Sequence, residues 1–162
     1  GSLPCAMITA AQLREQVGQI RAATAGPINL NFFTHRSPRP DAAAEAAHSL
    51  AAAHGCVVAV SGPVDRITDG ARVATVTAGH EWMTLVTGVG CSLGALMAAF
   101  AAAESDRLVA ATAATAMMCV AAERAARRTV APGSFAIALI DELYLVTPDE
   151  VAEQGGIRCV QA

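Results

Sequence analysis

A glycine-rich turn that runs directly into an apolar helical pattern is the strongest constraint on this chain. The turn ends in Gly88-Val89-Gly90-Cys91, and apolar residues at helical spacing follow over residues 92–103. Glycines before a helix permit backbone conformations that other residues avoid, and the amides of the first turn have no partner within the helix. Together with the positive end of the helix dipole, these amides suit a phosphate or a developing oxyanion. The pattern therefore predicts an anion-binding helix start.

Cys91 lies at the start of that predicted helix. A helix N-terminus stabilises a thiolate, so Cys91 is a candidate base or nucleophile. The alternative is that Cys91 is a small buried hydrophobic residue beside a common kind of turn. The turn by itself leaves both interpretations open.

A second pattern precedes the turn. An apolar run over residues 56–60 is followed by Ser61-Gly62, then by Asp65 and by Asp69-Gly70. This order predicts a buried strand, a tight turn and a hairpin closed at Asp69-Gly70. Asp65 and Asp69 could contribute to the nucleotide side of a site, although turn chemistry alone accounts for Asp69-Gly70.

These motifs, followed by Pro132-Gly133-Ser134-Phe135, resemble in order the C-terminal half of hydroxyethylthiazole kinase, a member of the ribokinase-like superfamily. The resemblance covers residues 41–151. It implies transfer of the γ-phosphate of ATP, with Mg²⁺, to the primary alcohol of 4-methyl-5-(2-hydroxyethyl)thiazole in thiamine salvage. It also implies a trimer whose active sites lie between subunits.

Site residues follow from the same resemblance by position. It implies that Ser61 contacts ATP and that Gly88 contacts the thiazole. It further implies that Gly88, Val89 and Gly90 form an anion hole and that Cys91 takes the proton of the substrate. A helix start with a nearby base suits phosphoryl transfer, because that reaction needs positioning and charge neutralisation more than covalent chemistry.

This sequence departs from the family pattern in two places. Val89 stands where the family usually has threonine, and Leu85 stands where it commonly has lysine. In addition, the family's N-terminal half, with most of the thiazole contacts and an arginine that binds ATP, has no counterpart here. A catalytically silent structural or interaction module is therefore one alternative to a kinase.

The cations of this chain exclude one class of nucleotide site. All eleven Lys and Arg residues are arginine, so no lysine can clamp a phosphate, and a Walker-type site is excluded. Arg124, Arg127 and Arg128 gather near a predicted helix C-terminus, where cations interact favourably with the dipole. For these three we favour a solvated helix end over a grip on phosphate.

The first forty residues indicate a different origin. Residues 1–7, a helix, and residues 27–35 resemble nitronate monooxygenase, an FMN enzyme on a TIM barrel, and Asn31 matches an Asn that lies near the flavin. Two strands and one helix are too few to close an eight-stranded barrel. We therefore interpret the chain as two regions, 1–40 and 41–162, with the junction at residues 37–41. An FMN-dependent oxidoreductase fragment is the second alternative function.

Composition sets the class of protein. A length of 162 residues, 54% hydrophobic residues and a net charge of −3 predict a soluble domain without a nucleic-acid or membrane partner. The apolar stretches 93–103 and 108–122 are shorter than the roughly 20 residues that span a bilayer, so we expect buried helices. We expect no secretory signal and a cytoplasmic location.

The histidines and cysteines offer no second site. The five cysteines fit neither a disulfide framework nor a zinc pattern, and we expect Cys56 and Cys119 to be packing residues. His48 and His54 do not share a helix face, so we expect no metal there. For His80, followed by Glu81, we favour a surface loop over an acid–base pair.

The order of expected elements is βαβα, a hairpin, and then helices. It predicts an α/β class: an incomplete ribokinase-like layered fold with an open sheet of about four to five strands and packed helices. The expected elements are a strand at 3–7, a helix from Thr9 with a capping box to Gln12, a strand at 28–33, a linker around Pro38 and Pro40, a helix capped by Asp41 and running through His54, a strand at Val57, a hairpin at Gly70, two long helices divided at Ser105-Asp106 with the second ending near Arg128, a helix after Pro132, and a short helix from Pro148.

Overall fold

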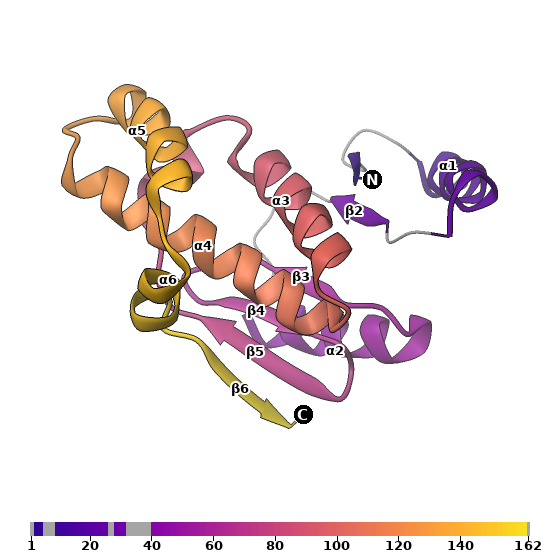
Figure 1. The fold of residues 1–162 in the computed structure, drawn as a ribbon. Coiled ribbons are helices and arrows are strands. Elements are labelled where there is room, and N and C mark those ends of the chain that lie inside the picture. The colour runs from indigo at the N-terminus through magenta and orange to yellow at the C-terminus, as the bar shows by residue number, and fades with distance from the viewer. Residues whose placement is uncertain (1, 5–8, 26–27, 32–39, 162) are drawn as a thin grey trace.

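The structure, a computed structural model, describes residues 2–4, 9–25, 28–31 and 40–161. Figure 1 shows helices gathered on a four-stranded sheet, with a small N-terminal unit beside them. The elements are β1 (Ser2–Pro4), α1 (Ala10–Ala23), β2 (Asn29–Asn31), α2 (Pro40–His54), β3 (Val58–Val60), β4 (Asp65–Thr68), β5 (Arg72–Val76), the 3₁₀ helix η1 (Glu81–Leu85), α3 (Val89–Ala103), α4 (Arg107–Arg127), α5 (Pro132–Leu145), α6 (Pro148–Gln154) and β6 (Arg158–Gln161).

The main sheet is antiparallel, in the order β3-β4-β5-β6. Val58 lies opposite Thr68 across the first strand pair, and Asp65 lies opposite Val76 across the second. The predicted hairpin is confirmed between β4 and β5. Gly70 has φ +85°, and a Cβ there would lie 2.7 Å from the backbone nitrogen of Ala52, so α2 approaches the turn too closely for a side chain.

The α/β class and the open four-stranded sheet agree with the expectation, while the two N-terminal strands pair elsewhere. β1 and β2 form a separate parallel pair in which Ser2 lies opposite Asn29. Both strands contact α3, as Figure 1 shows, so the N-terminal region packs on the helix that carries the glycine-rich turn. The division of the chain at residue 40 stays a prediction.

Helix α4 is the centre of the core. It contacts α3, α5, α6 and the strands β4 and β5. Among the described helices it alone is long and apolar enough to cross a membrane, but 72% of its most apolar window is buried inside the fold. The expected buried helix is therefore confirmed. The buried residues of its two hydrophobic clusters are Leu93, Met118, Ala121, Ala122, Ala125, Phe135, Ala138 and Leu139, and Ile67, Ala74, Val76, Leu108, Ala111, Ala116 and Cys119.

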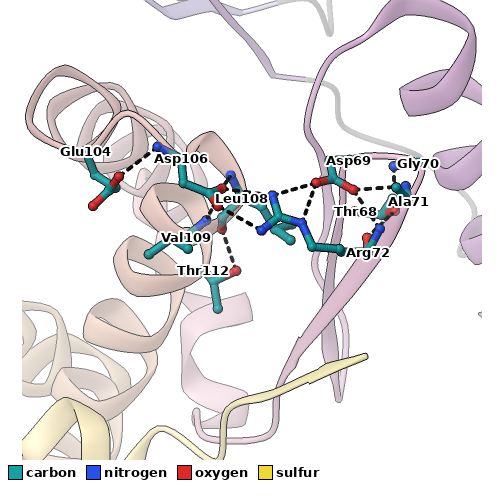
Figure 2. Close-up of polar contacts among 10 residues, drawn as sticks. All are labelled: Thr68, Asp69, Gly70, Ala71, Arg72, Glu104, Asp106, Leu108, Val109 and Thr112. Atoms are coloured by element: carbon teal, nitrogen blue, oxygen red, sulfur yellow. Dashed lines mark hydrogen bonds and ion pairs between the residues drawn. The ribbon is translucent and has the colours of Figure 1, made fainter. Parts of the chain in front are cut away.

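An ion-pair cluster ties the hairpin to the start of α4, and Figure 2 shows its members. The guanidinium of Arg72 donates to Asp69 at 2.9 Å and to both carboxylate oxygens of Asp106 at 2.7 and 3.0 Å. Asp106 also caps α4, because its Oδ1 accepts from the backbone amides of Leu108 and Val109. Its hydrogen bond with Arg72 is the largest of the effects that lower the pKa of Asp106 to about 2. The cluster fixes the hairpin against the helix.

The helix ends agree with the sequence in most places. The capping boxes of Thr9 with Gln12 and of Thr147 with Glu150 are both present. The assignment of Asp41 as a cap was wrong, because α2 already begins at Pro40, a residue that suits a first turn since it has no amide hydrogen to satisfy. Residues 5–7, 32–33 and the predicted linker around Pro38 lie outside the described residues.

Candidate active site

The start of α3 is an open turn. Gly88 is the N-cap residue with φ +95° and ψ −11°, in the left-handed region that favours glycine, and its carbonyl accepts the amide of Ser92 at 2.8 Å. Among the described residues no side chain caps this helix, and a Cβ built on Gly88 would meet none of their atoms within 4 Å. It is therefore the left-handed backbone conformation, and not crowding, that favours glycine at this position.

Cys91 lies in the first turn of α3 and is an exposed, free thiol. Gly90 beside it is exposed as well, while Val89 is half-buried and packs against the core. The alternative that Cys91 is a buried packing residue is therefore wrong. The first turn of α3 therefore carries both the backbone amides of residues 89–91 and an exposed thiol.

An aromatic cluster holds the segment that leads to this turn. His80 caps η1, and its Nδ1 accepts the amide of Trp82 at 3.2 Å. The ring centroid of Phe135 lies 6.0 Å from that of His80 and 5.8 Å from that of Trp82. His80 lies in a loop, as expected, but it is half-buried because its ring packs near the fully buried Phe135 of α5. The Pro132-Gly133-Ser134-Phe135 motif thus anchors the segment before Gly88.

The Ser61-Gly62 turn connects β3 and β4, and a buried carboxylate lies beneath it. Ser61 is exposed, whereas Asp65 is only 9% exposed and accepts the Gly62 amide at 2.9 Å. Burial raises the pKa of Asp65, and interactions with Gly62, Cys119 and Ser61 only partly oppose that increase. Asp65 therefore supports the turn from inside.

One face of α4 reaches both segments. The Cys119 thiol donates to Asp65 Oδ2 at 3.2 Å, and Glu123 Oε1 accepts the amide of Gly79 at 3.1 Å. Residues four apart share a helix face and are separated by about 6 Å along the axis. Cys119 is buried, as expected, and burial followed by the neighbouring Asp65 raises the pKa of its thiol, which keeps it a neutral donor. Neighbouring turns of α4 thus hold Asp65, beneath the Ser61-Gly62 turn, and Gly79, before η1.

The three arginines at the end of α4 have defined partners. Arg124 and Arg128 both bind Glu142 of α5, which is 1% exposed, and Arg124 also binds Glu150. The expected solvated helix end was therefore wrong for Arg124, whose side chain is only 24% exposed, because α5 folds back and places Glu142 beside it. Arg127 and Arg128 are exposed, as expected, although Arg127 also pairs with Glu123 and Arg128 with Glu142. Burial disfavours the charged form of Glu142, but the hydrogen bonds from both guanidinium groups outweigh it and hold its pKa below the usual range.

Comparison with known proteins places this arrangement in a family. A model of the hydroxyethylthiazole kinase family matches residues 36–149. The chain belongs to the hydroxyethylthiazole kinase family. A hydroxyethylthiazole kinase of Cutibacterium acnes is 67% identical over 109 residues, which are 67% of this chain and 39% of that protein. One of Clavibacter sepedonicus is 53% identical over 113 residues, or 70% of this chain and 41% of that protein.

The solved structure of hydroxyethylthiazole kinase from Pyrococcus horikoshii OT3 matches the fold of this family member. Its TM-score is 0.78 at 31% identity, over 98% of this chain and 65% of that one. Of the two curated hydroxyethylthiazole kinases named above, by contrast, the chain spans only about two fifths of the length. The comparisons do not show the resemblance of residues 1–40 to nitronate monooxygenase, which stays a prediction.

Proposed function

We propose that this chain phosphorylates the hydroxyl of 4-methyl-5-(2-hydroxyethyl)thiazole with ATP, a step of thiamine salvage. One observation carries the proposal: a chain of this family presents the uncapped first turn of α3 with the exposed Cys91 beside it. Backbone amides at a helix start bind phosphate oxygens, and the Cys91 side chain lies in the same turn.

Each residue of the proposed site has a defined role, and Gly88 has two. Ser61 contacts the nucleotide, Gly88 contacts the thiazole, and the turn of Gly88, Val89 and Gly90 neutralises the charge that develops on the transferred phosphate. Cys91 is the base that takes the proton of the alcohol. The alcohol oxygen then forms a bond to the γ-phosphorus, the bond to the β,γ-bridging oxygen breaks, and ADP leaves.

Magnesium would have to arrive with the nucleotide. Among the residues that the structure describes, no group of three or more His, Cys, Asp and Glu side chains could hold a metal ion. Mg²⁺ commonly binds through substrate phosphates and one or two carboxylates, with water filling its remaining positions. A resident metal site does not fit the described residues, and we assign no protein ligand to the ion.

The rest of the site belongs to the part of the relatives that this chain does not span. We propose that the chain works in the cytoplasm as an oligomer, a trimer as the resemblance implies, and that a separate chain supplies the missing thiazole contacts. Without that supply, the chain would bind nucleotide but transfer nothing. A catalytically silent module is the competing outcome.

The test is calorimetric titration of the folded protein with ATP and Mg²⁺, with and without the thiazole alcohol, followed by a turnover assay. We expect saturable binding. Cys91→Ala should abolish transfer and leave ATP affinity unchanged, and Cys159→Ala, at another exposed free cysteine, should change neither. Val89→Thr should improve binding or turnover, because it restores a hydroxyl near the phosphates. No heat from a sample that melts cooperatively would reject the kinase proposal, whereas co-purified FMN would favour the flavoenzyme fragment.

A further inference from the structure

We infer that Asp65 is a positioning residue for the nucleotide site, acting through the Ser61-Gly62 turn that it holds. The inference rests on the proposed function for the identity of the ligand, a nucleoside triphosphate. The sequence indicates that Asp65 could contribute to the nucleotide side of a site, and the structure shows a way for it to do so without touching the ligand.

The first argument is the burial of Asp65. A carboxylate that served only the surface turn would remain in water, where it costs nothing to keep charged. Asp65 is instead 9% exposed at the start of β4, and removing a carboxylate from water is costly unless its oxygens are bonded. A buried carboxylate with a defined partner on each oxygen has a definite geometry to impose.

The second argument is how those oxygens are used. Oδ1 accepts the amide of Gly62 at 2.9 Å, and Oδ2 accepts the thiol of Cys119 at 3.2 Å. One oxygen therefore holds the turn and the other holds the carboxylate to the central helix. Because Cys119 is 2% exposed and α4 is the most buried helix, the anchor is rigid.

The third argument is the contact with Ser61. The hydroxyl of Ser61 interacts with the Asp65 carboxylate, yet Ser61 itself is exposed. The same hydroxyl is therefore close to a fixed acceptor and accessible to a ligand. A hydroxyl that donates to a carboxylate still has lone pairs on its oxygen that can accept from a ligand. The series of contacts from Cys119 through Asp65 to the Ser61-Gly62 turn therefore positions the Ser61 side chain for contact with a nucleotide.

A double-mutant cycle with Ser61 tests the inference. We expect Asp65→Ala to weaken ATP binding by about tenfold, the loss expected for a hydrogen bond that involves a charged group. In a Ser61→Ala background the same change should have little further effect, because the two residues act as one unit. Asp65→Asn keeps an oxygen for the Gly62 amide and should recover part of the affinity. If Asp65→Ala does not fold, Asp65→Asn replaces it in the cycle.

Asp106→Asn is the matched control. It removes a charged hydrogen bond from the same interface of sheet and helix, but at the opposite end of the hairpin. It should lower stability without changing ATP affinity. Independent, multiplicative effects of Asp65→Ala and Ser61→Ala would overturn the inference, and so would wild-type affinity in Asp65→Ala.

A second measurement needs no nucleotide. Amide hydrogen exchange of Gly62 should become at least about tenfold faster in Asp65→Ala. Exchange of the buried Ile67, which lies with Asp65 on β4, should stay slow. If the wild-type protein binds no ATP, the proposed function fails, and the selective change at Gly62 still supports the positioning of the turn. Equal acceleration at Gly62 and Ile67 would show a general loss of stability and overturn the inference.

Discussion

Replacing Glu142 by glutamine isolates the one carboxylate that joins the end of α4 to α5. Its side chain is 2% exposed and accepts hydrogen bonds from Arg124, at 2.5 Å, and from Arg128. Glutamine keeps the shape and one acceptor oxygen, but it turns an NH₂ group toward one of the two guanidinium groups. Two cations then face a neutral side chain in the interior.

The loss of stability in Glu142→Gln depends on how exposed Arg124 and Arg128 are. Removing one member of a buried ion pair typically costs about 3–5 kcal/mol. The cost is smaller here because Arg128 is 57% exposed and regains water, and because Arg124 keeps its bond to Glu150. One charged hydrogen bond is then lost outright, which gives a decrease of about 2 kcal/mol in the free energy of unfolding. For a chain of this length the melting temperature should fall by about 4–8 °C.

Circular dichroism during thermal and urea unfolding measures this change. Asp141→Asn, an exposed neighbour on the same helix, removes the same charge and should change the free energy of unfolding by less than about 0.5 kcal/mol. The folded pKa of Glu142 is lowered from 4.5, so its stabilisation is complete above pH 4.5 and is lost as the pH falls through the folded pKa. The difference between the wild type and Glu142→Gln should shrink in that range. Equal stability of Glu142→Gln and Asp141→Asn at pH 7 would refute this reasoning.

Two further substitutions test the backbone and the hairpin. Gly156→Ala should lower the free energy of unfolding by about 1–2 kcal/mol, because Gly156 has φ +57° and the new Cβ would lie 2.1 Å from Thr77 Oγ1. Thermal melts measure this change. Gly133→Ala is the control, because a Cβ on Gly133 meets none of the described atoms within 4 Å, and it should show no such loss. Asp106→Ala should destabilise more than Asp106→Asn, since asparagine still caps α4. The contribution of the Asp106 charge is present above pH 3.8 and lost as the pH falls through about 2, so melts of Asp106→Asn and the wild type should converge there, and added salt should narrow the gap at neutral pH.

Local signals carried most of the fold prediction. The capping boxes at Thr9 and Thr147 and the Asp69-Gly70 turn depend on residues a few positions apart, so the sequence pattern contains them. Strand β6 was not predicted. All four of its residues are exposed at the sheet edge, so they show no alternation, and the strand forms only because the chain returns beside β5.

The site shows the same limit. The sequence pattern located the open turn at Gly88, because a left-handed N-cap and an apolar helix are local features. It could not show that Glu123 holds Gly79 or that Glu142 lies between two arginines, because both contacts join residues far apart in the chain. A lone acid on the apolar face of α5 was the available signal for Glu142. The sequence does not show whether an acidic residue is buried or exposed, because burial depends on how the elements pack.

The alanines on the buried faces of α4 limit how this sequence can drift. Ala114, Ala116, Ala121, Ala122 and Ala125 are all fully buried. Most larger side chains at these positions would push the neighbouring helices or the sheet away from α4, since a close-packed interior has little spare volume for them. Selection on a randomised α4 should therefore return mainly glycine, alanine, serine and cysteine there. The small side chains of α4 therefore set the distance between this helix and the elements packed on it. Related sequences that keep these residues small are free to vary the loops at either end of the helix.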